Sequence, residues 1–487
     1  MGAASSAPVA IHWFRNDLRL SDNPALAAAA AHGRVIPVAI EDPALVAAHP
    51  AGAAFAWWRG RALAALDRAL GGTLRALRGD PAEALRALAA RHGASLITWT
   101  RAYEPWTIAR DTAVKAALAG ARLQARSANG ALLWEPWETL KPDGAPYRVF
   151  TPFYRRGCLG AAPPRRPLPA PHLDLVPRAP DEPGLAAPDE APWQARLGRL
   201  WRIGEDAAHD ALQGFVQERL AGYAKGRDFP ALGRTSRLSP YLAHGQLSPN
   251  QVWHAVEAAG PPEDVAKFRA ELGWREFSAH LLFHFPKLAH APLRPEFAAM
   301  PWRDDPEGLE AWRRGRTGVP LVDAGMRELW QTGYMHNRVR MVVASFLTKN
   351  LLIDWRAGAR WFADCLVDHS PASNLASWQW VAGSGADAAP YFRVFNPAAQ
   401  AAKFDPQGDY IRRFVPELAR LPDRWLGAPW SAPAEVLAQA GLRLGRDYPR
   451  PLVDLAASRQ RALDAHRALG AKAAAEEREA QAQGEAP

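Results

Sequence analysis

Cysteine and long apolar runs are both scarce in this chain. Only two of its 487 residues are cysteines, Cys158 and Cys365, and no C-x-x-C pair occurs. This count excludes a disulfide framework and fits a reducing cytoplasm. No window approaches the roughly 18 uncharged apolar residues of a membrane span. The N-terminal sequence MGAASSAPVAIHWF lacks the features of a signal peptide. We therefore expect a cytoplasmic protein with no membrane-spanning segment.

A glycine-rich nucleotide-binding loop is also missing. The first apolar run, Val9 to Phe14, is followed by RNDLRLSDNPAL, which contains no glycine. Dinucleotide-binding folds place G-x-G-x-x-G at this turn to hold a pyrophosphate. Here Asp22 or Asn23 can instead cap a helix whose first residue is Pro24. The absence argues against an oxidoreductase with a nicotinamide site of the usual kind.

Tryptophan and positive charge are abundant. The chain has 20 Trp against 17 Phe and 9 Tyr, an excess that packing alone does not require and that indicates stacking or electron transfer. The formal net charge is +9. This charge makes nucleic acid the first partner to test, although an Arg-rich chain can be basic without binding DNA.

The length and the apolar pattern predict two domains, the first of them α/β. A chain of 487 residues exceeds what one core usually supports. Within residues 1–135, short apolar runs alternate with segments of helical period, which indicates a Rossmann-like parallel-sheet domain. The runs are Val9 to Phe14, Arg34 to Ile40, Thr73 to Leu77 and Ser95 to Thr100.

The remainder divides into a linker, a helical domain and a tail. Residues 136–200 are dense in proline and poor in periodicity, as in an interdomain linker. Helical spacing continues through residues 201–455 and predicts a large all-α domain. Residues 456–487 are rich in Ala and Glu, and we expect a surface helix that frays into disorder after Gly470.

One stretch of the helical region, Asp368 to Gln400, combines residue types that core helices rarely hold together. Small residues let a flat ligand approach the backbone, indoles stack on it, and Asn or Asp can hydrogen-bond a heteroaromatic edge. The stretch therefore predicts a site for a planar cofactor. Its polar residues are Asp368, His369, Ser370 and Asn374, and its tryptophans are Trp378 and Trp380.

Three further segments carry residues that could do chemistry, each with a structural alternative. The hydroxyls and guanidinium of TSRLS suit a phosphate site, or a helix cap with a surface Arg. Glu271, Trp274 and Arg275 share a helix face that could bind a base, or form an ion pair beside a core Trp. Asn337 and Met341 lie one turn apart and could contact a base, or fill the core.

A histidine pair does not indicate a metal site. His280 and His284 are four residues apart, but Leu281 follows the first histidine where H-E-x-x-H requires glutamate. We therefore expect no metal.

The motifs together have a recognisable order. The segments WFRNDLRLSDNPAL, TSRLSPYLAHG, WREF, MHNRVRM, LIDWR and WQWVAGSGADAAPYFRVFNP closely resemble the class I cyclobutane pyrimidine dimer photolyases of the photolyase/cryptochrome family. The match runs from about Val9 to Pro451 in the family's order and spacing. Each motif alone is weak, and the ordered set is highly specific.

The resemblance implies a folded FAD in the helical domain and an antenna chromophore in the α/β domain. By position, the phosphates would be held by Tyr223, Thr235, Ser236, Arg237, Leu238 and Ser239. The flavin would contact Phe268, Asp368, His369, Ser370 and Asn374, with Asn374 facing the flavin N5. Electrons would reach the flavin along the relay Trp302, Trp355 and Trp378.

The resemblance also implies a substrate, UV-damaged DNA with the pyrimidine dimer flipped out of the duplex. Light-excited reduced flavin would donate an electron, the cyclobutane ring would open, and the electron would return. Glu271 would polarise the dimer, Asn337 and Met341 would contact it, and Trp274 and Trp380 would form aromatic walls. Arg275, Arg338, Arg393 and Lys403 are candidates for contacts to DNA phosphates. We expect a monomer.

The chain departs from the family pattern at two places. Ser370 stands where relatives often have a second acidic residue, and residues 375–377 replace a common Asn-Gly-Gly run, which bears on flavin redox tuning. Trp106 and Thr107 stand where folate-using relatives carry an Asn-Glu pair, and only His49 favours folate. The antenna is thus a methenyltetrahydrofolate, a deazaflavin, another flavin, or absent.

Two related functions compete with dimer repair. A cryptochrome photoreceptor shares the fold and the flavin, but Glu271, Asn337, Met341 and Trp380 are all present and the tail is short. A (6-4) photolyase of the iron–sulfur branch needs four cysteines, and the animal-like branch usually has His in place of Asn337.

Overall fold

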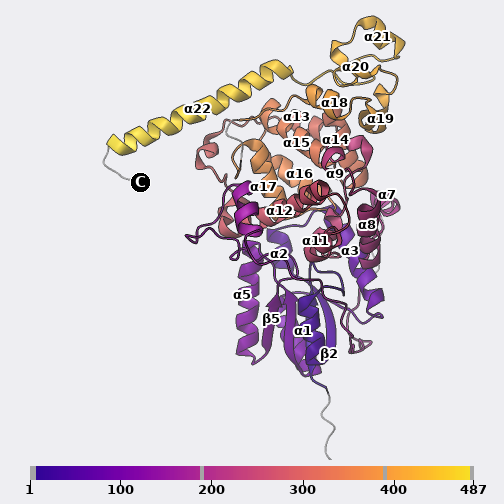
Figure 1. Ribbon diagram of the computed structural model, residues 1–487, viewed down its shortest axis with the longest axis vertical. Helices are drawn as coiled ribbons and strands as arrows, with labels where there is room; N and C mark the ends of the chain where they lie inside the picture. Colours follow the sequence, from indigo (N-terminus) through magenta and orange to yellow (C-terminus); the bar gives the residue numbers. More distant parts are fainter. Residues whose placement is uncertain (1–6, 187–190, 388–391, 483–487) are drawn as a thin grey trace, which may run out of the picture.

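The computed structural model describes residues 7–186, 191–387 and 392–482. Tyr391 of the predicted aromatic run and residues 483–487 of the predicted tail lie outside the described residues. Figure 1 shows an elongated molecule with a β-sheet at one end and a body of helices at the other. The predicted fold, an α/β domain followed by a large helical domain, is confirmed.

The sheet has five parallel strands in the order β3-β2-β1-β4-β5. Their bounds are β1 Val9–Phe14, β2 Arg34–Glu41, β3 Arg75–Arg78, β4 Ala94–Thr100 and β5 Gln124–Ala128. The first, second and fourth strands match the prediction closely, and the third begins two residues later than expected. β5 was not predicted, because its sequence QARSA is polar and offers no apolar run.

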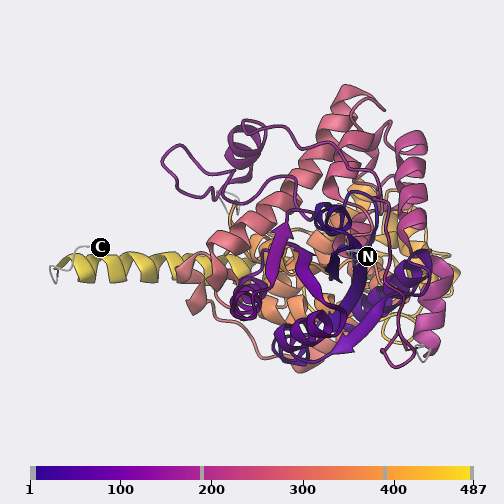
Figure 2. The same cartoon turned by 90° about the horizontal axis from the view of Figure 1, so that it is seen from below.

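Alternating side chains on each strand serve two separate cores. From β1, Ala10 and Phe14 pack with α1 (Pro24–His32) and α3 (Ala53–Ala69). Ile11 and Trp13 point to the other face and pack with α4 (Pro81–His92) and α5 (Pro105–Gly120). Figure 2 shows these helices on both sides of the sheet. This two-residue period is what a parallel sheet covered on both faces requires.

The predicted cap at the start of α1 is confirmed. The side-chain oxygen of Asn23 accepts a hydrogen bond from the Leu26 amide at 3.0 Å, and Pro24 is the first helical residue. Proline is also the first helical residue of α12, α14, α17 and several shorter helices. Its fixed φ and missing N–H suit the first turn of a helix, which accounts for part of the chain's high proline content.

The described parts of the predicted linker 136–200, residues 136–186 and 191–200, contain regular elements. These elements are α6 (Phe150–Pro152), the π-helix η1 (Phe153–Cys158) and α7 (Pro192–Leu200), and Leu175 bridges to Val35 beside β2. Phe153 and Cys158 are each 1% exposed. The segment therefore connects the domains in sequence but also contributes aromatic side chains to the core, which its proline-rich composition did not indicate.

The helical domain surrounds α17, which begins three residues after Asp368. Helices α12, α15 and α16 all pack against α17. The helices of this domain are α8 Glu205–Glu218, α9 Tyr223–Gly226, α10 Ser239–Ala243, α11 Pro249–Ala255, α12 Pro262–His284, α13 Pro306–Arg313, α14 Pro320–Thr332, α15 Asn337–Ser345, α16 Trp355–Cys365, α17 Pro371–Ala382, α18 Pro397–Phe404, α19 Asp409–Phe414, α20 Asp423–Leu426 and α21 Ala434–Gln439. Shorter elements are α2 Pro43–Ala48, η2 Pro230–Leu232, η3 Pro286–Ala289, η4 Pro295–Ala299, the π-helix η5 Phe346–Asn350, η6 Pro416–Leu418 and η7 Pro429–Ser431.

The tail differs from its prediction. Helix α22 runs from Leu455 to Ala482, so the expected fraying after Gly470 is wrong. Gly470 lowers helix propensity but does not end the helix, because Ala, Glu and Lys on either side favour it. Figure 1 shows α22 leaving the helical body and projecting away from it. Over the described residues, no helix is long and apolar enough to cross a membrane.

The two domains meet through close backbone contacts that only glycine allows. Gly245, at φ +65°, lies so near Asn16 that a Cβ would overlap the Asn16 carbonyl oxygen. Gly52 approaches Ala363 of α16 in the same way. Buried Arg19 donates to the Gly245 carbonyl at 2.9 Å across this joint. The joint therefore fixes the α/β domain against the helical domain.

We expect Gly245→Ala to lower the thermal unfolding midpoint. A left-handed backbone costs a non-glycine residue about 1–2 kcal/mol, and the overlap with Asn16 adds to this cost. Gly120→Ala is the matched control, because nothing lies within 4 Å of a Cβ at Gly120. Calorimetry of both variants would contradict the role of the joint if Gly245→Ala unfolded at the same temperature as the control.

Candidate active site

A cavity of about 1510 Å³ lies between the two domains. This volume exceeds the roughly 300–1,000 Å³ of sites for drug-sized ligands. Most of the residues expected to hold FAD line it: Tyr223, Ser236, Leu238, Ser239, Phe268, Asp368, His369, Ser370 and Asn374. Thr235 and Arg237 are not among the described residues that line it. Arg237, at φ 55°, lies over the Trp201 ring at 4.4 Å instead.

Asp368 is held by an ion pair in which the carboxylate is buried and the Arg340 side chain is 24% exposed. Its carboxylate accepts two hydrogen bonds from Arg340 Nη2, at 2.8 and 3.1 Å, and one from the Ser239 hydroxyl at 2.6 Å. Three elements meet there: α15 supplies Arg340, α10 supplies Ser239, and Asp368 precedes α17. The short charge-assisted bonds fix the carboxylate at the cavity wall.

Two polar atoms at the cavity have no hydrogen-bond partner among the described residues. The Asn374 amide donates to the Ala359 carbonyl at 2.9 Å, and over the described residues its side-chain oxygen accepts nothing. His369 Nδ1 is buried and lacks a hydrogen-bond partner in the part of the chain described. Burial lowers the pKa of His369 to about 4, despite the neighbouring Asp368, so the ring is neutral near pH 7. Such free, neutral groups suit the polar edge of a flavin.

Trp378 is buried against a glycine and two aromatic rings. It is 2% exposed, and a Cβ at Gly358 of α16 would overlap its indole. Its ring centroid lies 5.0 Å from Phe362 and 6.2 Å from Trp312. Trp355, also 2% exposed, and the partly buried Trp302 belong to the same hydrophobic cluster. The structure thus gathers the three predicted relay residues in one core and adds Trp312, which the sequence prediction omitted.

Glu271 lines the cavity beside two cations, Arg227 directly after α9 and Lys267 of α12. Its carboxylate pairs with Arg227, and with Lys267 Nζ at 3.3 Å. Asp228, which follows Arg227 in sequence, pairs with Arg338 of α15 at 2.8 Å. The adjacent residues Arg227 and Asp228 therefore link Glu271 to Arg338 through two ion pairs.

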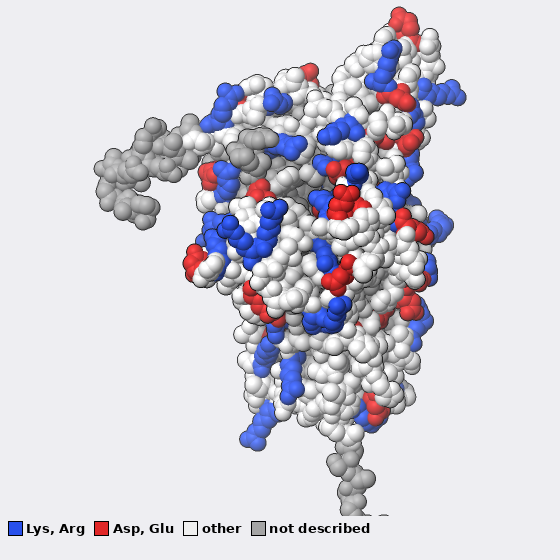
Figure 3. Space-filling view, in the orientation of Figure 1, with Lys and Arg blue, Asp and Glu red and all other residues white. Residues whose placement is uncertain are grey.

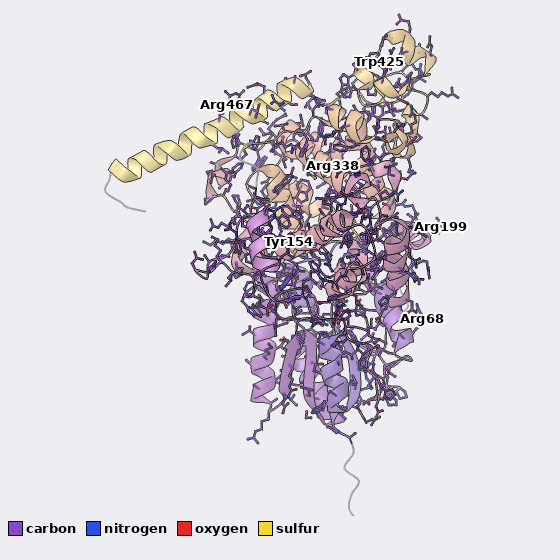
Figure 4. The ribbon with its side chains drawn as sticks, viewed as in Figure 1. Arg68, Tyr154, Arg199, Arg338, Trp425 and Arg467 are labelled. Atoms are coloured by element: carbon purple, nitrogen blue, oxygen red, sulfur yellow. The ribbon has the colours of Figure 1, made fainter. Side chains whose placement is uncertain are left out.

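Arg338 and Lys403 meet at a single ring. Their charged groups lie 4.5 and 5.1 Å from the centroid of Phe404 in α18. Figure 4 shows Arg338 in the middle of the helical part. In the view of Figure 3, basic side chains are scattered over this part, with acidic ones among them. The two predicted phosphate-binding cations thus share one region of the surface.

The predicted aromatic walls are supported from outside their own helices. Trp274 stacks on Phe150 of the predicted linker at 3.7 Å, with planes 8° apart. The Trp380 indole N–H donates to the Asp387 carbonyl at 3.0 Å. Asn337 is the exposed first residue of α15, and Met341 lies one turn later, partly buried. These four residues are not among the described residues that line the large cavity.

Arg275 and Arg393, the other two predicted DNA contacts, lie in different environments. Arg275 lines the cavity and pairs with buried Glu276 at 3.2 Å. Arg393 is exposed, and its guanidinium lies 4.8 Å from the Phe395 ring. Arg275 therefore faces the cofactor space, whereas Arg393 faces solvent.

The histidine pair of α12 has a structural role. His280 Nε2 accepts a hydrogen bond from the Tyr147 amide at 3.1 Å, and its ring lies 4.5 Å from that of His284. Over the described ranges, no group of three or more metal-binding side chains occurs. His280 thereby ties α12 to the segment before α6.

The α/β side of the cavity holds aromatic and cationic groups. His49 stacks on Trp106 at 4.2 Å, and both line the cavity. The guanidinium groups of Arg15 and Arg110 lie 5.0 and 4.8 Å from the Trp13 ring. A flat anionic molecule would find stacking surfaces and positive charge here. These features suit each of the expected antenna chromophores and do not distinguish among them.

Comparison with known proteins identifies the family. Residues 10–172 match the family model of DNA photolyase, and residues 268–468 match that of the FAD binding domain of DNA photolyase. A deoxyribodipyrimidine photo-lyase of Agrobacterium fabrum is 48% identical over 95% of this chain and 98% of the relative. This chain belongs to the photolyase/cryptochrome family. Its FAD-binding domain is the helical domain that carries the cavity residues of α12, α15 and α17.

Members of both branches of the family are similar to this chain. Cryptochrome-2 of Arabidopsis thaliana is 38% identical over 97% of this chain and 79% of the relative. The crystal structure of a class III photolyase from Agrobacterium tumefaciens superimposes with a TM-score of 0.91, at 47% identity over 96% of this chain and 99% of that chain. The expected membership of class I is therefore not confirmed. An archaeal photolyase from Sulfolobus tokodaii (TM-score 0.79, 30% identity, 94% and 99% coverage) is described with two FAD molecules.

Some site residues were not found from the sequence. Arg340 lies in the motif MHNRVRM, three residues after Asn337. Its ion pair with Asp368 is visible only in the folded structure, because the two residues are 28 positions apart in sequence. Arg227 follows Tyr223 by four residues and could have been found as a helix neighbour. Phe150 gave no signal, because it lies in a proline-rich segment far from Trp274 in sequence.

We expect Arg340→Leu to lose bound FAD. The substitution leaves the Asp368 carboxylate buried without its cation, a change that costs about 3–5 kcal/mol. Arg338→Ala, on the same helix but paired with Asp228, is the control and should keep its FAD. The flavin-to-protein absorbance ratio after purification measures both. A normal ratio in Arg340→Leu would contradict the role of this ion pair.

Proposed function

We propose that this chain is a deoxyribodipyrimidine photo-lyase that uses FAD and light to split cyclobutane pyrimidine dimers in UV-damaged DNA. The observation that carries the proposal is the position of Glu271. It lines the same cavity as Phe268 and Asn374, one turn from Phe268 on α12, so a lesion-binding carboxylate lies next to the flavin groups. The 48% identity to an Agrobacterium photo-lyase supports the same reaction.

The cavity residues would hold FAD in defined roles. Bound there in its reduced state, FAD would supply the light-driven electron that opens the cyclobutane ring. Asp368, fixed by Arg340, and the free oxygen of Asn374 would accept hydrogen bonds from the ring edge. Ser236 and Ser239 would face the phosphates, and buried Phe268 would pack on the cofactor. Ser370 caps α17 without a side-chain bond and so adds no charge near the ring.

Glu271 and residues outside the cavity lining would together bind the lesion. Glu271, oriented by Arg227, would hydrogen-bond the dimer, and Asn337 and Met341 would contact it from α15. Trp274 and Trp380 would form the walls for a dimer flipped out of the duplex. Arg338 and Lys403, together at Phe404, would contact the flanking phosphates.

The similar proteins bear on the photolyase class and on the second candidate function. The similarity to the class III photolyase of Agrobacterium tumefaciens supports that class over class I. A cryptochrome-type photoreceptor is the second candidate, supported by 38% identity to Cryptochrome-2. That the protein acts as a cytoplasmic monomer stays a prediction.

Purified protein with reduced flavin should restore dimer-containing DNA only under blue light. Chromatography of the digested oligonucleotide measures the loss of dimers, which should not occur in the dark. An oligonucleotide that contains a (6-4) lesion should keep that lesion under the same light. Glu271→Gln should slow repair without releasing FAD. An absence of light-dependent repair, with FAD bound and reduced, would rule out the proposed enzyme and leave the photoreceptor.

Trp378→Phe should slow light-driven flavin reduction more than Trp302→Phe or Trp312→Phe. Trp378 contacts the cluster that contains both of these residues, so its loss would interrupt either route to the surface. Repair by chemically reduced protein should change little in all three variants. Flash absorption measures the reduction rate, and an unaltered rate in Trp378→Phe would mean that electrons reach the flavin by another path.

A further inference from the structure

The first half of helix α22 is docked against η4 and η5. At its start, Ser458 accepts a hydrogen bond from the Asn350 amide at 2.9 Å, and Arg461 donates to the Asn350 carbonyl at 2.6 Å. Ala462 is fully buried and Leu469 is 5% exposed, the latter in a cluster with Phe297 of η4. This half of α22 is therefore held by η4 and η5, whereas Figure 1 shows the far half projecting from the body.

From α22, His466 stacks on Phe392. The two rings lie 4.5 Å apart with planes at 17°, and Phe297 is 5.8 Å from His466. Burial lowers the pKa of His466, the cations Arg294 and Lys349 lower it further, and Glu296 acts in the opposite direction. The imidazole is thus neutral near pH 7 and can stack without repelling the neighbouring cations.

The side chain of Lys349 lies over the Phe392 ring. Its Nζ lies 3.4 Å from the Phe392 centroid and donates to the Arg393 carbonyl at 3.1 Å. Lys349 is 1% exposed, and no ion pair with a carboxylate is found for it within the described residues. Burial lowers the pKa of Lys349 to about 7, so the amine is only partly charged near pH 7, and its contacts are the ring and the carbonyl. These contacts hold Phe392 in one position.

Phe392 in turn packs on the end of α17. A Cβ at Gly383, the left-handed residue that ends this helix, would lie 3.0 Å from the Phe392 ring. Trp380 lies in the last turn of α17, three residues before Gly383, and its indole N–H donates to the Asp387 carbonyl. Asp387 is itself bound to the Arg148 carbonyl through its amide at 3.1 Å.

We propose that His466 is a positioning residue for lesion binding. Through Phe392 and Gly383 it fixes the last turn of α17 and, with it, the Trp380 wall of the dimer site. The C-terminal helix is in this way part of the substrate site, although it lies far from Trp380 in sequence. The inference rests on the proposed function, because Trp380 is a lesion contact only in a photolyase.

Affinity for dimer-containing DNA in the dark tests this role. His466→Ala should weaken binding of a duplex with one dimer about tenfold, because neighbouring residues couple by 0.5–3 kcal/mol. FAD photoreduction and repair yield per bound dimer should stay at the wild-type level. His466→Phe, which keeps an aromatic stack, should restore affinity. Arg467→Ala is the matched control on the same helix, where the side chain is 68% exposed and labelled in Figure 4.

A double-mutant cycle separates positioning from general stabilisation. If His466 acts through Phe392, Phe392→Leu should weaken binding alone, and adding His466→Ala should cause little further loss. The proposal is overturned by wild-type affinity in His466→Ala, by equal weakening in His466→Phe, or by additive effects in the cycle. Wild-type protein that binds and repairs no dimer would overturn the proposed function and this inference together, whereas repair with an unaffected His466→Ala would overturn the inference alone.

Discussion

The ion pair between the buried carboxylate of Asp368 and the partly exposed Arg340 is the interaction on which the site depends. A buried carboxylate is favourable only if it is well bonded, and here it also accepts a hydrogen bond from the Ser239 hydroxyl. The pair joins α15, which carries Asn337 and Met341, to the start of α17, which carries Asn374, Trp378 and Trp380. One contact therefore sets the distance between the groups proposed for the flavin and those proposed for the lesion.

Segments outside the helical domain complete this arrangement. The predicted linker supplies Phe150, which stacks on Trp274, and Arg148, whose carbonyl binds Asp387 after Trp380. The α/β domain closes the cavity from the other side, with His49 and Trp106 facing it. Because glycines at the joint allow the two domains to touch, an antenna bound there would share one cavity with FAD.

The sequence was sufficient for the fold class, and nine of the eleven residues predicted to hold FAD line the cavity. Strands with continuous apolar runs and the cap at Asn23 were predictable, whereas polar β5 and the length of α22 were not. The ordered set of motifs predicted Asp368, Asn374 and Glu271 as site residues, because the set is specific although each motif alone is weak. Partners across the fold, such as Arg340, Arg227, Phe150 and Trp312, were not predictable, since only packing brings them near those residues.

A crystal structure of the FAD-bound protein with a duplex that contains one thymine dimer tests the central claim most directly. The flavin should lie in the cavity within hydrogen-bond distance of Asn374 and Asp368. The dimer should be flipped out between Trp274 and Trp380, with Glu271 bonded to it. A dimer that stays in the duplex, or a flavin bound away from Asn374, would contradict the account.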